Sequence, residues 1–276
     1  MLSLILAIIS SALVSVGMRF SERHGKGRVP MLAVNYVVCT AMATIFAGFG
    51  GLNAEGLGPA MGIGAISGVL YLGSFVLLQW CVGRSGVILS AAFMKLGVLV
   101  PTVMAVVLFH EQPQITQLIG LLLTVAAIIM MNLKGSGERV KGLGGLVILL
   151  LAGGMTDGMS KIYEQAGAAE WKGVYLLITF GVALILCAAL AVVKKQRMTK
   201  ADWLDGLMIG VPNYFSALFL LQSLSTVPAM VAYPTYSVAT IAVVSLIGVA
   251  AFRERLTRRQ WAAIGVIAAA LVLLNL

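Results

Sequence analysis

The sequence of residues 108–133 is LFHEQPQITQLIGLLLTVAAIIMMNL, and 143 positions later residues 251–276 carry AFRERLTRRQWAAIGVIAAALVLLNL. Both copies have Phe-x-Glu, then Gln six residues after the Glu, and both end in Asn-Leu. The alignment continues without a gap back to Tyr71 and Tyr214, and it places Gln79 opposite Gln222. Polar identities at a fixed spacing rarely arise by chance in apolar segments, so we interpret the chain as an internal duplication.

The composition around this repeat is that of a protein dissolved in lipid. Of the 276 residues, 60% are hydrophobic and only 11% are charged, whereas soluble domains have roughly 45–50% and about 25%. The mean hydropathy is +1.02. The net charge of +9 is confined to short clusters between apolar runs, which is typical of membrane loops and excludes nucleic-acid binding. A soluble globule is excluded as well.

Ten apolar runs are near the length of about 20 residues that a helix needs to cross a bilayer. We therefore predict an all-α membrane protein with ten transmembrane helices. Their approximate ranges are 2–18, 30–49, 58–80, 86–109, 115–133, 142–161, 173–193, 203–223, 228–251 and 259–276. Pro101, Pro212 and Pro234 fall inside these runs and predict kinks, because proline cannot donate the helical hydrogen bond.

The distribution of positive charge predicts the orientation. Sixteen of the 19 Lys and Arg residues lie in odd-numbered loops and two in even-numbered loops. Because cytoplasmic loops retain Lys and Arg, we expect the odd-numbered loops inside and both termini outside the cytoplasm. The localisation we predict is the cell (inner) membrane.

The repeat divides the chain into residues 1–138 and 139–276, each with five predicted spans. Since five is odd, the second half must enter the membrane from the opposite side to the first. The fold class we predict is therefore two inverted five-helix repeats. Carriers with this organisation hold their substrate near the bilayer midplane and work by alternating access.

The two motifs Phe109-x-Glu111 and Phe252-x-Glu254, each between a fourth and a fifth span, resemble the signature of the drug/metabolite transporter superfamily, EamA-type. The resemblance covers nearly the whole chain. It implies a ten-helix carrier of small metabolites, often an exporter, whose cavity is lined by the third, fourth, eighth and ninth spans. The sequence departs from the pattern in the fifth span, where the glycine is offset between the copies, at Gly120 and Gly265.

Lys95 lies about ten residues into the fourth predicted span. A charge at that depth is costly unless it faces a wet cavity or a partner, so Lys95 is a candidate site residue. We weigh two roles: an anchor for a substrate carboxylate or phosphate, and a structural ammonium held by carbonyls, hydroxyls or a carboxylate. Thr102, seven residues on, should return to the same helical face.

Asp157 is the only carboxylate placed well inside a predicted span. It could couple transport to protons, or it could be the partner of Lys95. The simpler interpretation, which we favour, is an ion pair with Lys161 four residues further along the same helical face.

Polar and aromatic side chains inside other spans complete the predicted site. Tyr233, Tyr236 and Thr240 form a polar stripe with helical spacing in the ninth span. Further candidates come from the third and eighth spans, namely Tyr71, Gln79, Asn213 and Tyr214. Hydrogen bonding between packed helices is the alternative explanation for each of them. We interpret Glu111 and Glu254 as structural residues that cap helices or pair with nearby arginines.

We predict a transporter and not an enzyme, because no metal motif, nucleophile or phosphate loop lies in the spans. No metal or cofactor is expected. A membrane-embedded enzyme and a channel or helper subunit are the alternatives. The expected partners are the bilayer and a small-molecule substrate, for which one cation and several aromatics favour an amphipathic compound with an anionic group, such as an amino or organic acid. A monomer and a homodimer are both compatible with the sequence.

Overall fold

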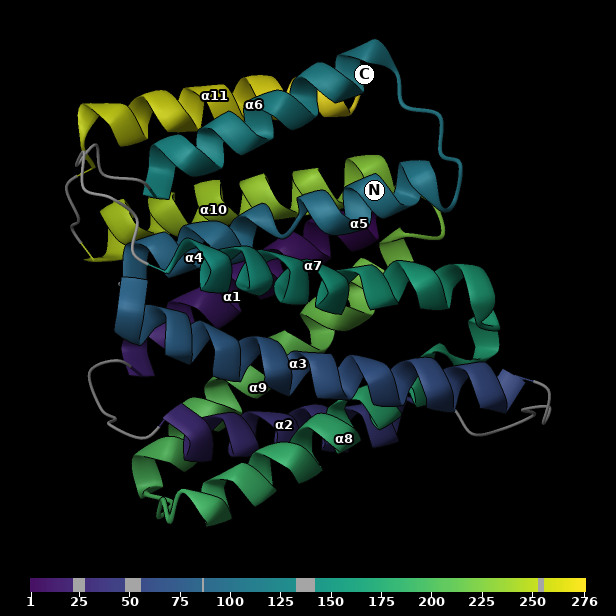
Figure 1. The fold of residues 1–276 in the computed structure, drawn as a ribbon, viewed down its shortest axis with the longest axis vertical. Helices are drawn as coiled ribbons and strands as arrows, with labels where there is room; N and C mark the ends of the chain where they lie inside the picture. Colours follow the sequence, from purple (N-terminus) through teal and green to yellow (C-terminus); the bar gives the residue numbers. More distant parts are fainter. Residues whose placement is uncertain (22–27, 48–55, 86, 133–141, 253–255) are drawn as a thin grey trace. The chain divides into compact units, whose positions relative to one another are not determined.

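A computed structural model describes residues 1–21, 28–47, 56–85, 87–132, 142–252 and 256–276. These residues form helices joined by turns, and no strand occurs among them. The helices, in chain order, are α1 (Leu2–Ser21), α2 (Arg28–Phe46), α3 (Leu57–Ser85), α4 (Val87–Leu96), α5 (Leu99–Val107), α6 (Ile115–Asn132), α7 (Leu143–Ala166), the short η2 (Ala169–Trp171), α8 (Lys172–Val193), α9 (Lys200–Ser223), α10 (Ala229–Phe252) and α11 (Arg258–Leu274) (Figure 1).

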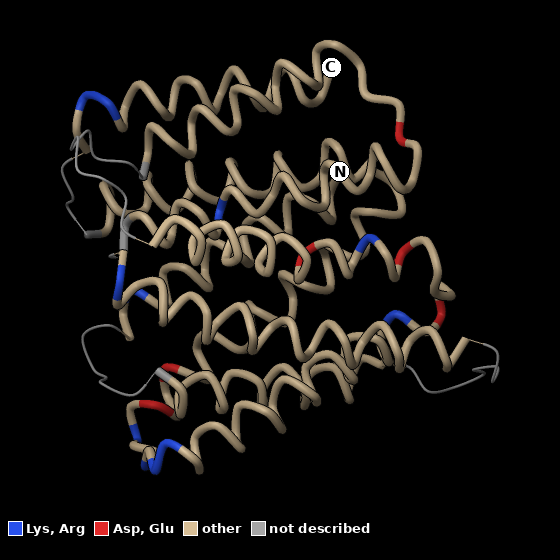
Figure 2. The backbone as a smooth tube through the Cα atoms, viewed as in Figure 1, with Lys and Arg blue, Asp and Glu red and all other residues tan. Residues whose placement is uncertain are grey.

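The helices have the composition of membrane spans. Eight helical segments of the described chain are long and apolar enough to cross a bilayer, and α6 is a shorter apolar helix. Large apolar side chains such as Ile5, Ile9 and Leu13 of α1 are about half exposed, which suits contact with lipid tails. Figure 2 shows most charged residues at helix ends and in connections. The predicted all-helical membrane fold is confirmed, while the count of ten spans stays a prediction.

The fourth predicted span differs from the sequence expectation because it is two helices. α4 ends at Leu96 and α5 begins at Leu99. Pro101 has no N–H to donate to the carbonyl of Gly97, and that carbonyl instead accepts a hydrogen bond from Val100 N at 2.9 Å. The proline thus interrupts the helix one turn before its own position.

The chain folds into two compact units, and each unit takes segments from both halves of the sequence. Unit 1 comprises residues 1–72 and 159–223, and unit 2 comprises residues 73–158 and 224–276. The sequence repeat alone does not predict this exchange of segments, which arises because helices of one half pack on helices of the other.

In unit 1, α2 packs against α8 and α9, and α1 packs against α9. Two glycine pairs with Gly-x-x-x-Gly spacing allow close crossings. A Cβ at Gly210 would lie 2.9 Å from the Asn35 carbonyl oxygen on α2, and a Cβ at Gly68 would lie 2.6 Å from the Thr179 carbonyl oxygen on α8. Gly206 and Gly64, one turn earlier, make the matching contacts. The third helix of each half therefore crosses the second helix of the other half in the same way.

Equivalent helices of the two halves run in opposite directions. In unit 1, Gly173 at the start of α8 adjoins Ala47 just after the end of α2, while the Cys187 thiol lies 3.6 Å from the Val29 carbonyl oxygen near the start of α2. These equivalent helices run antiparallel.

The same relation holds in unit 2 for α6 and α11, which lie side by side (Figure 1). Gly120, near the start of α6, contacts Ala270 and Leu274 at the end of α11. Two separate pairs of equivalent helices thus have opposite directions within their own units.

Candidate functional site

Lys95 occupies the last turn of α4, immediately before the break in the fourth span. Its side chain is partly buried. Among the described residues its ammonium has no hydrogen bond or ion pair within 4 Å, and Asp157 is the charged group with which it interacts electrostatically. A cation without a direct partner among the described residues and the carboxylate that interacts with it thus belong to the same unit.

Close packing of α7 against α4 and α5 brings these two residues together. A Cβ at Gly97 would lie 2.9 Å from Gly154 N and 2.9 Å from the Leu150 carbonyl oxygen. Gly153 faces Met94 and Gly158 faces Met104, so the two segments run parallel along this contact. Lys95 is two residues from Gly97, and Asp157 is three residues from Gly154. Both residues therefore lie within one turn of the glycine contact.

Neighbouring helices fix the turn of α7 that carries Asp157. The buried Tyr233 of α10 donates a hydrogen bond from its hydroxyl to the Asp157 main-chain oxygen at 2.8 Å. On the adjacent residue, Thr156 shares a 2.9 Å hydrogen bond with Ser74 of α3. Among the described residues the Asp157 carboxylate accepts no hydrogen bond and has no salt bridge within 4 Å. It can therefore accept a proton or a ligand donor.

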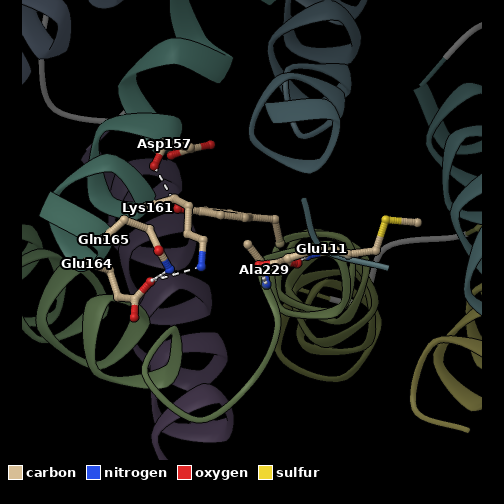
Figure 3. A network of polar contacts seen from close by, with 8 residues as sticks. Glu111, Asp157, Lys161, Glu164, Gln165 and Ala229 are labelled. Carbon is tan, nitrogen blue, oxygen red and sulfur yellow. Dashed lines mark hydrogen bonds and ion pairs between the residues drawn. The ribbon is translucent and has the colours of Figure 1, made fainter. Parts of the chain in front are cut away.

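Lys161, the expected partner of Asp157, forms an ion pair one turn further along α7 (Figure 3). Its ammonium lies 2.9 Å from Glu164 Oε2, and the side-chain amide of Gln165 donates to the same oxygen at 2.8 Å. Lys161 is buried, so this pair satisfies a second intramembrane cation. Because Lys161 is paired with Glu164, the charged group that interacts with Asp157 in the described chain is Lys95.

The polar stripe of α10 has mixed roles. Tyr233 binds the α7 main chain, Tyr236 is partly buried, and Thr240 is buried with a hydroxyl that has no hydrogen-bond partner among the described atoms. Gln79 of α3 is also partly buried in unit 2. The Thr102 hydroxyl donates to the Val98 carbonyl at 2.8 Å and so supports the helix break instead of reaching the ammonium.

The remaining predicted site residues belong to unit 1. Asn213 of α9 donates to Asn35 Oδ1 at 3.2 Å, and its amide also lies 3.6 Å from the Cys39 sulfur. Asn35 was not identified from the sequence, although it is an isolated amide within an apolar run. It is almost completely buried in α2, next to the Gly210 crossing. Asn213 therefore makes a hydrogen bond between packed helices.

Tyr71 and Tyr214 both pack against Phe180. Their ring centroids are 5.9 and 6.3 Å from that of Phe180, and Tyr214 also stacks on Phe46. Tyr214 is fully buried, and its hydroxyl has no hydrogen-bond partner among the described atoms. Of the nine predicted site residues, the structure thus joins Lys95, Asp157 and Tyr233 in one group and Tyr71 with Tyr214 in another.

Glu111 caps a helix of the other half, which confirms the expected structural role. Its carboxylate accepts hydrogen bonds from Ala229 N at 3.1 Å and Met230 N at 3.0 Å, at the start of α10 (Figure 3). An anionic cap is favourable there because a helix N-terminus carries partial positive charge. Glu254, its partner in the repeat, lies outside the described residues. Within the described part of the chain, no cluster of His, Cys, Asp or Glu could hold a metal ion.

A duplicated set of membrane-length helices, with equivalent helices antiparallel within each unit, is an organisation that membrane transporters use. The chain belongs to the EamA-like transporter family, which matches residues 1–133 and again residues 144–276. It is therefore an integral membrane protein of a transporter family that is generally not enzymatic. The duplication inferred from the polar identities corresponds to these two matches.

Two individual similarities accompany the family match. An uncharacterized protein of Haemophilus influenzae is 24% identical over 271 residues, which cover 94% of this chain and 92% of that protein. A protein of known crystal structure has a TM-score of 0.77 at 13% identity, covering 99% of this chain and 98% of the other. At that identity the second similarity supports the fold alone.

Proposed function

We propose that the protein is a ten-helix carrier of the cell (inner) membrane that moves a small metabolite by alternating access, as an exporter or an exchanger. The proposed repeats are residues 1–138 and 139–276, with both termini outside the cytoplasm. Family membership supports transport, and the antiparallel equivalent helices support the inverted arrangement that alternating access uses.

The substrate assignment rests on one observation, the partial burial of Lys95 without a direct partner in the described chain. Its ammonium is partly buried among apolar helices and has no direct hydrogen-bond or ion-pair partner in the described chain. An intramembrane charge is expensive and faces a partner or a polar pathway. Asp157 compensates it electrostatically without a direct bond. We therefore propose that Lys95 anchors the carboxylate or phosphate of an amphipathic metabolite, such as an amino or organic acid.

The test is thermal stabilisation of the purified protein by a metabolite panel, with wild type and Lys95→Gln measured together. A ligand that binds only the folded state raises its apparent stability, by about 2.7 kcal/mol at a hundred times its Kd. We expect anionic members of the panel to raise the Tm of wild type and to leave Lys95→Gln unchanged.

Lys161→Gln is the matched control, because it also removes a buried lysine but one that is already paired with Glu164. This variant should have a lower Tm and an unchanged response to anions. If neutral or cationic compounds stabilise wild type and Lys95→Gln equally, the anchor assignment is wrong. Whichever compound stabilises the protein, its uptake and counterflow in proteoliposomes separate a carrier from a channel, since only a carrier shows counterflow.

A further inference from the structure

We propose that Lys95 and Asp157, which lie along one helix–helix contact of unit 2, are compensating charges through which the carrier takes up one proton with each anion that it binds. The inference rests on the proposed function, because it assumes that the substrate anion binds at Lys95. It adds the proton as a second transported species and assigns it to the Asp157 carboxylate.

The first step is the charge balance of the empty protein. Lys95 and Asp157 lie in unit 2, along the contact of α7 with α4 and α5. The two charges interact without a direct hydrogen bond. Together they are neutral, which lowers the energy of burying either one. The absence of a direct bond leaves the ammonium able to change partners.

The second step is what an anion does to this balance. If the anion contacts Lys95 while Asp157 stays ionised, three charges share a site of low polarity with a net charge of −1. Like charges disfavour ionisation of the carboxylate, and a proton on Asp157 restores neutrality. An anion and a proton join the Lys95 ammonium and the Asp157 carboxylate, and the products are a Lys95–anion ion pair and a neutral Asp157 carboxyl.

The groups on the helices around Asp157 determine which of them takes the proton. From α4, the charged group facing Asp157 is Lys95; from α10, Tyr233 contacts only its main-chain oxygen. From α3, Ser74 contacts the neighbouring Thr156. On α7 itself, Glu164 is engaged with Lys161. Asp157 is therefore the carboxylate that can compensate for an anion at Lys95.

Two consequences follow for transport. Anion and proton move in the same direction and carry no net charge, so a pH difference drives the process and a membrane voltage does not. The net direction depends on the product of the anion and proton gradients. A steep outward anion gradient gives export, and each exported anion takes a proton with it.

The experiment measures proton uptake upon ligand binding to the full-length protein in weakly buffered detergent solution. The probes are benzoate, L-glutamate, succinate and inorganic phosphate, and a pH-sensitive dye reports the protons. For a probe that stabilises wild type, we expect uptake of about one proton per bound anion, and a Kd that rises up to tenfold per pH unit where Asp157 is ionised. Asp157→Asn should bind the same probe without proton uptake, and its Kd should be nearly independent of pH.

Glu170→Gln serves as the control, because it removes an exposed carboxylate beyond the end of α7. It should take up protons as wild type does. Binding of a probe without proton uptake by wild type, or equal uptake by Asp157→Asn, overturns the exchange mechanism and leaves the Lys95 anchor intact. Failure of every probe to stabilise wild type overturns the proposed anchor instead, so the two failures are distinguishable.

Thermal unfolding without ligand tests the interaction of the two charges even where a variant misfolds and binds no probe. If the two charges neutralise each other, Lys95→Gln and Asp157→Asn should each lower the Tm, and the double variant should have a higher Tm than either single variant. A double variant whose loss equals the sum of the two single losses shows that the pair does not exist and overturns the proposal.

Discussion

At the scale of the residue, two buried tyrosines differ in what their hydroxyls contact. The Tyr233 hydroxyl donates to the Asp157 main-chain oxygen, whereas the Tyr214 hydroxyl has no hydrogen-bond partner among the described atoms. The sequence predicts both as site residues, because each is a polar group inside a span. The structure separates them, because one hydroxyl holds α7 in place and the other remains unsatisfied in an aromatic cluster.

This contrast predicts opposite effects of the same substitution. Tyr233→Phe should lower the free energy of unfolding by about 1 kcal/mol, since it removes a hydrogen bond between helices. Tyr214→Phe should leave it unchanged or raise it slightly, because a buried hydroxyl without a partner is itself unfavourable. Unfolding in mixed detergent micelles measures both. A larger loss for Tyr214→Phe than for Tyr233→Phe would contradict the assignment.

Sequence alone could identify Lys95 and Asp157, because charges stand out in apolar runs. It could not identify their relation, since i to i+4 spacing pointed to Lys161 and the contact between α4 and α7 is formed by residues far apart in the chain. Asn35 could not be identified as a site residue from the sequence, for a related reason. A single amide in a span is informative only when its partner, here Asn213 of α9, is known.

At the scale of the element, the contact between the broken fourth span and α7 depends on glycine. A Cβ at Gly154 would clash with the Gly97 carbonyl oxygen and would lie 2.5 Å from Val100 Cβ. Hydropathy predicted these helices and their approximate ends. The break at Gly97 was not predicted, because a proline inside a span indicates a kink but does not determine which turn of the helix is interrupted.

Gly154→Ala should therefore force α7 away from α4 and α5. Overpacking of this kind lowers stability by roughly 1–3 kcal/mol. Gly181→Ala in α8 is the control, because a Cβ there meets no atom within 4 Å. It should be neutral or stabilising, since alanine favours helix over glycine. Thermal unfolding should give a lower Tm for Gly154→Ala than for Gly181→Ala. Equal Tm values would rule out the close contact.

The Glu111 cap gives a second prediction for an element. Glu111→Ala removes the acceptor of two main-chain N–H groups at the start of α10, so it should lower stability by about 1 kcal/mol. The effect should be local, with faster hydrogen exchange at Ala229 and Met230. Mass spectrometry of peptides covering the start of α10 reports this exchange. Unchanged protection there would show that the cap is dispensable.

At the scale of the whole molecule, the sequence predicted the duplication, which the two family matches confirm. The repeat offset and the odd number of spans per half depend on local pattern alone. The exchange of segments between units could not be predicted in this way, because it depends on which faces of α2, α8 and α9 meet. Orientation in the membrane depends on loop charges, and it leads to the last prediction.

The connections on either side of α8 should lie on opposite sides of the membrane. Glu170 precedes α8 in an even-numbered loop, and Gln196 follows it in a loop rich in Lys and Arg. Because positive loops stay in the cytoplasm, a membrane-impermeant thiol reagent should label Glu170→Cys in intact cells and Gln196→Cys only after the membrane is opened. Both positions are exposed, and the three native cysteines are buried, so wild type should remain unlabelled. The reverse pattern would invert the proposed orientation, and labelling of both variants from one side would show that α8 does not cross the membrane.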